Sequence, residues 1–398
     1  MLSFTCIEYS YGVPMSNSST LHDVQTFISS QNAAPLKEGE LQKLEDYTRE
    51  TLVCANSALG MIFVRFKKIL QESKFSDGVK KLFASDVSWD EGGKFVAFKA
   101  DFKAFDDLSN YYGNQYRGSF VLIYLLGALA VLAALVPVGF AFEEHFGHDA
   151  HHLGTLFTVI ELFLILTILL VNRVGTNPHG GHSKTSILGF RLNRRWHERW
   201  IEYRILAERF RYMEILYPIG INPLKDGAAK KSDLGEWINA YFAMRLTQVQ
   251  SELTIDRSAY KVRLKQVMQE QATYHKENAH RCEHIYHRLH TVANWLFYGT
   301  LIACASHFIW HNPILTLAAG FFPALAAAMH GILANGEFSK AADISERMHE
   351  AIEELIKRLD ESSGEDEIKN IAVKFHNIVL GEALSWRAMF KDKNVPLA

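Results

Sequence analysis

The strongest constraint on the fold is a run of 25 consecutive residues, Gly118 to Phe142, that contains no charged side chain. At a helical rise of 1.5 Å per residue this run is about 37 Å long, which is enough to cross a hydrocarbon core of about 30 Å. Three further apolar runs follow, at Leu153 to Val171, Asn294 to Trp310 and Pro313 to Leu333. One such run is also compatible with a buried helix of a soluble protein. Four runs in two closely spaced pairs predict an all-α membrane protein with four transmembrane helices in two hairpins.

The overall composition hides this pattern, because the apolar residues are concentrated in a few runs. The formal net charge is −2, and the 42 Lys and Arg nearly balance the 44 Asp and Glu. Any anion-binding role must therefore come from a local cluster of basic residues. The four cysteines form no CxxC pair, which favours a reducing compartment over a disulfide framework.

The distribution of Lys and Arg predicts the orientation. The loop Glu143 to His152 and the turn His311-Asn312 contain no Lys or Arg. Basic residues flank the other ends of the four runs, at Arg117, Arg173, Arg288 and Lys340. By the positive-inside rule, the two short loops lie outside and both termini are cytoplasmic.

These boundaries divide the chain into six parts, of which the polar ones are expected to be long cytosolic helical extensions. The seam Trp196, Trp200, Tyr203, Ala207 and Phe210 and the seam Met348, Ile352, Leu355 and Leu359 have the spacing of packed helix faces. The predicted parts are a flexible N-terminus (1–36), an N-terminal cytosolic helical region (37–116), transmembrane hairpin 1 (117–173), a central cytosolic helical region that is a possible ligand sensor (174–292), transmembrane hairpin 2 (293–334) and C-terminal cytosolic helices (335–398).

Glu161 is the most informative residue inside the predicted spans. An acidic residue at a span centre costs about 2.5–3.5 kcal/mol, so it is expected to face protein or water. In an oligomer it could form a ring that favours cations, or it could bond a neighbouring His or Tyr and only fix the helix position. Pro323, His307 and His330 are further candidates for a pore or gating role. The stripe Gly320, Ala324, Ala328 fits either packing within one chain or oligomerisation.

The segment Lys184 to Arg211 is a second candidate for function, since it carries eight Lys and Arg against three Glu. Three interpretations remain open. The segment could attract anionic lipid headgroups, or it could be a solvated or salt-bridged helix face. It could also bind a nucleotide or oligonucleotide through arginine forks and aromatic stacking.

No enzyme chemistry is predicted. The sequence has no phosphate-binding Gly loop, no nucleophile elbow and no paired-carboxylate motif, so no catalytic residue and no cofactor are assigned. Histidines crowd the loop after the first run and one face of a later helix (His280, His284, His287), but they lack the partners of a metal site. No metal ligand is therefore assigned.

The stretch RWHERWIEYRILAERFRYMEIL (Arg195 to Leu216), which follows a predicted hairpin, resembles the SLATT-type effector modules of bacterial nucleotide-signalling defence systems, CBASS-like or Hailong-like. FFPALAAAMHGI (Phe321 to Ile332) and QATYHKENAHR (Gln271 to Arg281) are similar to related bacterial membrane proteins, and the resemblance covers about residues 100–360. It implies an effector that depolarises or permeabilises the bacterial inner membrane under control of a nucleotide made by a partner nucleotidyltransferase. The chain departs from that pattern by having two hairpins and no separate sensor domain.

The leading hypothesis is an oligomeric, ligand-regulated ion channel or pore of the bacterial inner membrane that acts in antiphage defence, with a tetramer as the favoured homo-oligomer. Its nucleotide or oligonucleotide ligand is predicted to meet Arg194, Arg195, Arg199, His275 and Arg281. Two alternatives are a non-conducting scaffold or receptor that recruits cytosolic partners, and a small secondary transporter.

Overall fold

A computed structural model of the chain is almost entirely helical. The structure describes residues 17–31, 35–50, 58–70, 96–140, 142, 147–175, 186–187, 190–191, 196–221, 236–248 and 257–390. Within these residues the one departure from helix and turn is a short antiparallel pair of two-residue strands, β1 (Ser186–Ile187) and β2 (Phe190–Arg191). Arg194 and Arg195, two of the predicted ligand-binding residues, lie outside the described residues.

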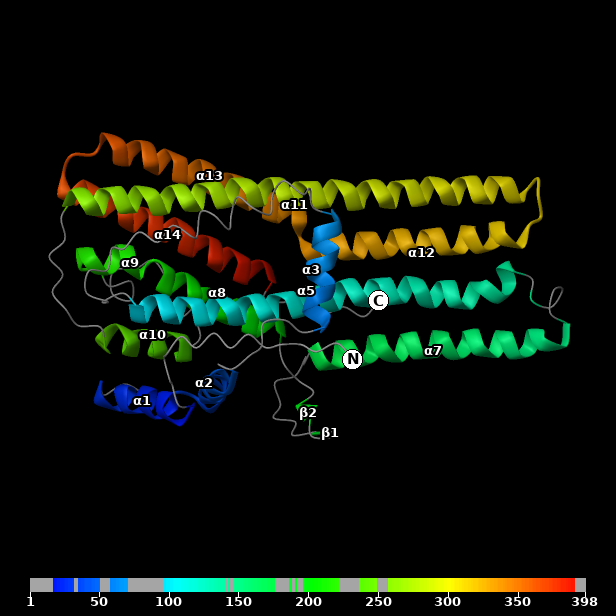
Figure 1. The fold of residues 1–398 in the computed structure, drawn as a ribbon, viewed down its shortest axis with the longest axis horizontal. Coiled ribbons are helices and arrows are strands. Elements are labelled where there is room, and N and C mark those ends of the chain that lie inside the picture. Colours follow the sequence, from blue (N-terminus) through cyan, green and yellow to red (C-terminus); the bar gives the residue numbers. More distant parts are fainter. Residues whose placement is uncertain are drawn as a thin grey trace.

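Helices α5 (Val96–Gly139) and α11 (Arg257–His307) run along much of the length of the molecule, and α7 (Ala150–Gly175) and α12 (Pro313–Gly336) lie beside one end of them (Figure 1). Helix α5 leads through the short 3-10 helix η2 (Gly147–Asp149) to α7, which returns alongside it. Helix α11 is followed by α12, and these two also lie side by side. The Asn312 side chain accepts a hydrogen bond from the Ile314 N–H at 2.9 Å, which caps the start of α12.

Three helices of the described chain are long and apolar enough to cross a membrane: α5, α7 and the helix that begins at Pro313. They coincide with the first, second and fourth predicted spans and indicate a membrane protein. The third predicted span, at the end of α11, is not among them, because its apolar run is short and is interrupted by Thr300, Ser306 and His307.

One end of the molecule exposes large apolar side chains to an extent that is unusual for a protein in water. We call this part the apolar end: residues 118–139 of α5, residues 294–307 of α11, and all of α7 and α12. On α7, Phe163 is 68% exposed, and on α11 Trp295 is 71% exposed. Lipid contact accounts for such surfaces, since hydrocarbon tails solvate apolar side chains.

Small residues allow α5 and α12 to pack closely within one chain. A side-chain carbon added at Gly320 would lie 2.7 Å from Leu135 Cδ1, and one at Gly139 would lie 2.6 Å from Leu317 Cβ. Ala328 of the predicted stripe is buried as well. These contacts confirm the packing interpretation of the stripe for Gly320.

The other end of the molecule is a bundle of polar, charged helices, which we call the polar bundle. It contains residues 96–117 of α5 and 257–292 of α11, together with α8 (Trp196–Arg211), α9 (Met213–Leu216), the 3-10 helix η3 (Tyr217–Ile219), α10 (Glu236–Gln248), α13 (Phe338–Glu361) and α14 (Glu365–Phe390). The two predicted seams are buried, including Trp196 on α8 and Ile352 on α13.

Within the described residues three short helices precede α5, and the first of them corrects a sequence prediction. Helix α1 (Asn17–Ser30) lies in the segment 1–36 that was expected to be flexible, and it buries Val24 and Ile28. Its apolar residues recur at helical spacing among many Ser and Gln, which masked the pattern. Helices α2 (Glu38–Glu50) and α3 (Ala58–Leu70) follow α1 along the chain.

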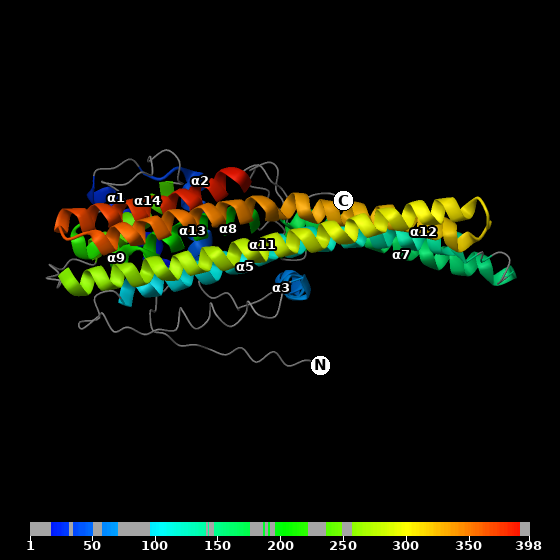
Figure 2. The same ribbon diagram turned by 90° about the horizontal axis from the view of Figure 1, so that it is seen from above.

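Helix α3 is placed crosswise to the long helices, at the junction of the polar bundle and the apolar end. It lies across the long axis in Figure 1 and is seen end-on in Figure 2. Gly118 makes this crossing possible, because a side chain there would collide with the backbone carbonyl of Leu59. Arg288 of α11 donates a hydrogen bond to the Ile69 carbonyl at 3.3 Å and ties the end of α3 to a second long helix.

Candidate functional site

Helix α8 occupies the middle of the polar bundle and is buried almost all round. Its apolar residues explain only part of this burial, because Glu208 is 2% exposed and Arg209 is 3% exposed. Charged groups are removed from water only where partners compensate them. The partners of these side chains therefore define the candidate site.

Glu208 is the centre of a buried charged network between α5 and α8. Its carboxylate lies 2.6 Å from Arg204 Nη2 and 3.4 Å from Arg211 Nη1. Asp106 of α5 lies 3.2 Å from Arg204 and 3.8 Å from Arg211. Two arginines thus share two carboxylates in a nearly dry interior, an arrangement that holds α5 and α8 in register.

Histidines of α11 and α14 lie beside this network. His275 is 1% exposed, and its Nε2 lies 3.9 Å from a Glu382 carboxylate oxygen. Burial lowers the pKa of His275 to about 4, in spite of the nearby Glu208, so the ring is neutral at physiological pH. Burial raises the pKa of Glu382 to about 6, and its carboxylate accepts a hydrogen bond from Trp386 Nε1 at 3.1 Å. His376 is also buried, and burial lowers its pKa to about 4.

Two further buried ion pairs fasten the outer helices to the bundle. Lys43 of α2 lies 2.8 Å from Glu202 of α8, and burial raises the pKa of Glu202 to about 7 although Lys43 counteracts it. Arg245 of α10 lies 2.8 Å from Asp101 of α5. We interpret both as structural ties, because each cation already has its carboxylate.

The predicted ligand-binding residues that the structure describes have different partners. Arg199 donates a hydrogen bond to the Tyr112 hydroxyl at 3.0 Å and stacks over the same ring. His275 belongs to the network described above. Arg281 lies further along α11, where its charge acts on Lys67 of α3. A vestibule shared by these residues stays a prediction.

Arg281 is part of a cluster that sequence reasoning missed. Lys67, Arg117 and Arg281 come from α3, α5 and α11, and the charges of all three act on the Cys282 thiol. Arg117 lies over the Phe63 ring of α3, one helical turn before Lys67. The Arg117 guanidinium lies 4.5 Å from the centre of the Trp200 ring. Burial lowers the pKa of Lys67 to about 8, and the charges of Arg281 and Arg117 lower it further. We call Lys67, Arg117 and Arg281 the junction cluster.

The four predicted pore residues lie at different levels of the apolar end. His307, whose ring centre is 5.5 Å from that of His311, lies at the turn before α12, whereas His330 lies near the other end of α12, 6.0 Å from His290. Pro323 is within α12 and is exposed. Glu161 is half-buried on α7 and has no hydrogen bond or ion pair with the described part of the chain. A pore role for these residues stays a prediction.

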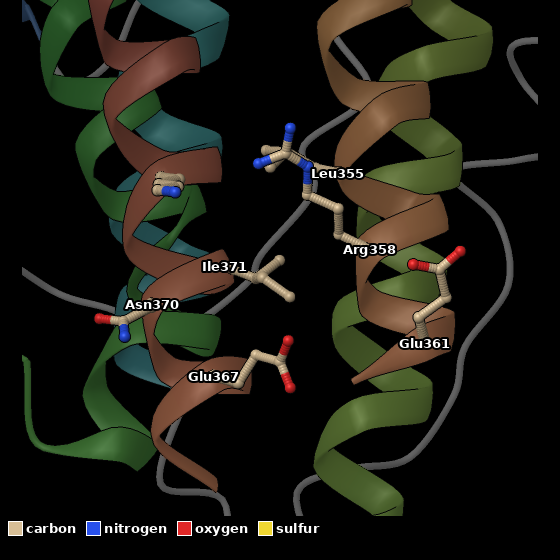
Figure 3. Close-up of a pocket in the computed structure, with 7 residues that line it drawn as sticks. Leu355, Arg358, Glu361, Glu367, Asn370 and Ile371 are labelled. Carbon is tan, nitrogen blue, oxygen red and sulfur yellow. The ribbon is translucent and has the colours of Figure 1, made fainter. Parts of the chain in front are cut away.

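Surface clefts of the polar bundle do not collect charge of one sign. The cleft in Figure 3, about 360 Å³, lies between α13 and α14 and is lined by Arg358 and Glu361 on one side and Glu367 and Ile371 on the other. A second cleft of about 420 Å³ lies between α11 and α13 and mixes His, Lys, Asp and Glu. Among the described residues no group of three or more His, Cys, Asp or Glu is arranged to hold a metal ion.

Comparisons with protein-family models, with curated proteins and with solved structures find no match to this chain. The resemblance to SLATT-type effectors therefore stays a prediction.

Proposed function

We propose that this chain is the subunit of an oligomeric ion channel or pore of the bacterial inner membrane, which an anionic ligand from inside the cell regulates. The observation that carries the proposal is the continuity of α5 and α11, each of which extends without a break from the polar bundle into the apolar end. A helix transmits displacement along its axis because its backbone hydrogen bonds are internal. A ligand that shifts these helices in the polar bundle would therefore move the membrane segments as well.

The end of α11 completes a four-span arrangement in this proposal. Trp295, Ile302 and Phe308 are 71%, 67% and 88% exposed, and such side chains are stable where lipid surrounds them. Paired with α12, this segment would make a second hairpin, with the short loops outside and both termini in the cytoplasm. Because the two outer loops are short, the polar bundle is then the part of the chain that binds the regulatory ligand.

Glu161 supports an oligomeric pore. Most of the α7 surface around it is exposed, and neighbouring Leu162 and Phe163 are 55% and 68% exposed. An acidic group without a partner among the described residues is expected to meet water or another subunit at membrane depth. Copies of Glu161 around an axis would give a ring of negative charge that favours cations.

The wider role follows the resemblance stated for Arg195 to Leu216. In this proposal the ligand is a nucleotide or oligonucleotide made by a partner nucleotidyltransferase, and the output is membrane depolarisation during antiphage defence. A bound nucleotide could either open or close the channel, because both signs are compatible with a two-state helical assembly.

Current through planar bilayers tests the proposal. Purified full-length protein is expected to conduct cations, and Glu161→Gln is expected to reduce the preference for cations over anions. Thr158→Val is the matched control, because the Thr158 hydroxyl donates only to the Gly154 carbonyl of its own helix. Absence of current with and without added nucleotides would refute the channel. Substrate flux without current would favour a transporter, and neither current nor flux would favour a scaffold or receptor.

A further inference from the structure

We propose that the junction cluster, Lys67, Arg117 and Arg281, is a binding site for a phosphate group at the inner face of the membrane. The three cations come from three helices that are distant in sequence. None of them makes a hydrogen bond or ion pair with a carboxylate of the described residues, and the buried Arg281 Nε has no partner there. The inference deepens the proposed function, and the role of the site in regulating the channel rests on that function.

The junction cluster differs from the other buried cations of the polar bundle. Arg204 and Arg211 are neutralised by Glu208 and Asp106. Arg209 donates a hydrogen bond to Asn239 at 3.0 Å. Removal of cations from water is unfavourable unless an anion or acceptor compensates it, and mutual repulsion within the junction cluster adds to that cost. An anionic ligand would remove both penalties.

The side chains are placed so that their donors remain available. Arg117 lies with its guanidinium 4.5 Å from the centre of the Trp200 ring and 5.4 Å from that of Phe63. A guanidinium stacked in this way keeps the N–H groups at its edge for hydrogen bonds. Cys282, on the same side of α11, does not supply a counter-charge, because burial raises the pKa of its thiol. Lys67 and Arg281 are half-buried, so both side chains keep part of their surface exposed at the junction.

Phosphate fits this donor set better than a carboxylate does. Two guanidinium groups and one ammonium group offer more donors than the two oxygens of a carboxylate can accept. Phosphate presents several oxygens in a tetrahedral arrangement, and arginine forks bind pairs of them. The site lies where α3 crosses the start of the first apolar run, at Gly118. A phosphate there can come from a lipid headgroup or from a soluble nucleotide.

The alkylation rate of Cys282 in the full-length protein measures occupancy of the site. A bound anion both covers the thiol and raises its pKa, so the thiol reacts more slowly with iodoacetamide. Free N-acetylcysteine, added to the same reaction, is the reference for the reagent, because Cys304 lies in the apolar end. One arm of the experiment adds ATP to protein in uncharged detergent. The other compares nanodiscs of phosphatidylcholine with nanodiscs that contain phosphatidylglycerol.

We expect about tenfold protection of Cys282 relative to free N-acetylcysteine in at least one arm, as for a site that is about 90% occupied. Protection by ATP identifies a soluble source, and protection only with phosphatidylglycerol identifies a lipid source. Lys67→Gln and Arg281→Gln are expected to abolish it, whereas Lys67→Arg retains it. Arg358→Gln, which removes an exposed charge on α13, is the matched control.

No protection in either arm, or protection that survives Lys67→Gln and Arg281→Gln, would overturn the assignment. Circular dichroism and size-exclusion elution identify any variant that fails to fold. In that case the protection of Cys282 is compared between Lys67→Arg and wild type. The binding measurement does not involve current. Protection without conductance would refute the channel but not the site, and conductance without protection would refute the site alone.

Discussion

Removal of the Glu208 charge provides the sharpest test of the buried network. The Glu208 side chain is 3% exposed, and it pairs with Arg204 at 2.6 Å and Arg211 at 3.4 Å. In Glu208→Gln both arginines would share the one remaining carboxylate, Asp106. Glutamine has nearly the volume of glutamate and still accepts hydrogen bonds, so the change isolates the loss of charge.

The expected loss is large because the charge is buried. Breaking a buried ion pair by neutralising one partner costs about 3–5 kcal/mol, and the retained acceptor places Glu208→Gln near 3 kcal/mol. At about 2 °C per kcal/mol for a chain larger than 150 residues, the melting temperature is expected to fall by about 6 °C or more. The exposed pair Glu354–Arg358 on α13, at 3.0 Å, is the matched control. Glu354→Gln is expected to cost about 0.3–0.5 kcal/mol.

Thermal unfolding in detergent, followed by tryptophan fluorescence, measures both variants. The double variant Glu208→Gln, Arg211→Leu is expected to recover part of the loss, because it leaves Asp106 with one arginine to neutralise in place of two. Equal melting temperatures for Glu208→Gln and Glu354→Gln would refute the reasoning. A double variant whose loss of stability exceeds the sum of the losses of its two single changes would also refute it.

Two further predictions concern pH and helix packing. Burial lowers the pKa of His376 to about 4 from an ordinary value of 6.5, so its contribution to folding stability is expected to fall by up to about 3 kcal/mol as pH drops from 6.5 toward 4. His376→Gln should therefore reduce the dependence of melting temperature on pH between pH 7 and 5, leaving the part due to His275. An unchanged dependence of melting temperature on pH would contradict this. Gly331→Ala is expected to destabilise the α5–α12 contact by about 1–3 kcal/mol because the added carbon meets the Tyr124 ring. Gly154→Ala, which meets nothing within 4 Å, is the control, and equal melting temperatures would contradict the packing.

Local patterns in the sequence were sufficient for the long helices. The uncharged run after Gly118 and the seam that contains Ile352 each depend on residues within a few turns of one another, so their periodicity predicts both the element and its buried face. The same reasoning failed where a helix contained few apolar residues. Helix α1 buries Val24 and Ile28 among polar neighbours, and contacts with other helices rather than its own composition place it.

The third predicted span shows a related limit. Segment Asn294 to Trp310 was chosen for its apolar residues and its terminal tryptophans, yet it is less apolar than the three helices that qualify by length and composition. Its assignment depends on exposure, since Trp295 and Ile302 face outward beside α12. Exposure is a property of the folded chain, which hydropathy along a sequence cannot supply.

Density of basic residues was a poor guide to an anion site. Segment Lys184 to Arg211 carries eight basic residues, but Arg204 is neutralised by Asp106, which precedes it by 98 positions. Arg117 and Arg281 belong to ordinary-looking segments, and the fold brings them together with Lys67 where no described carboxylate pairs with them. What attracts an anion is a local excess of positive charge in space. That excess depends on the acids that are absent from the neighbourhood as much as on the cations present. A sequence lists the cations, but only the packing of α3 across α5 and α11 reveals which of them lack a partner.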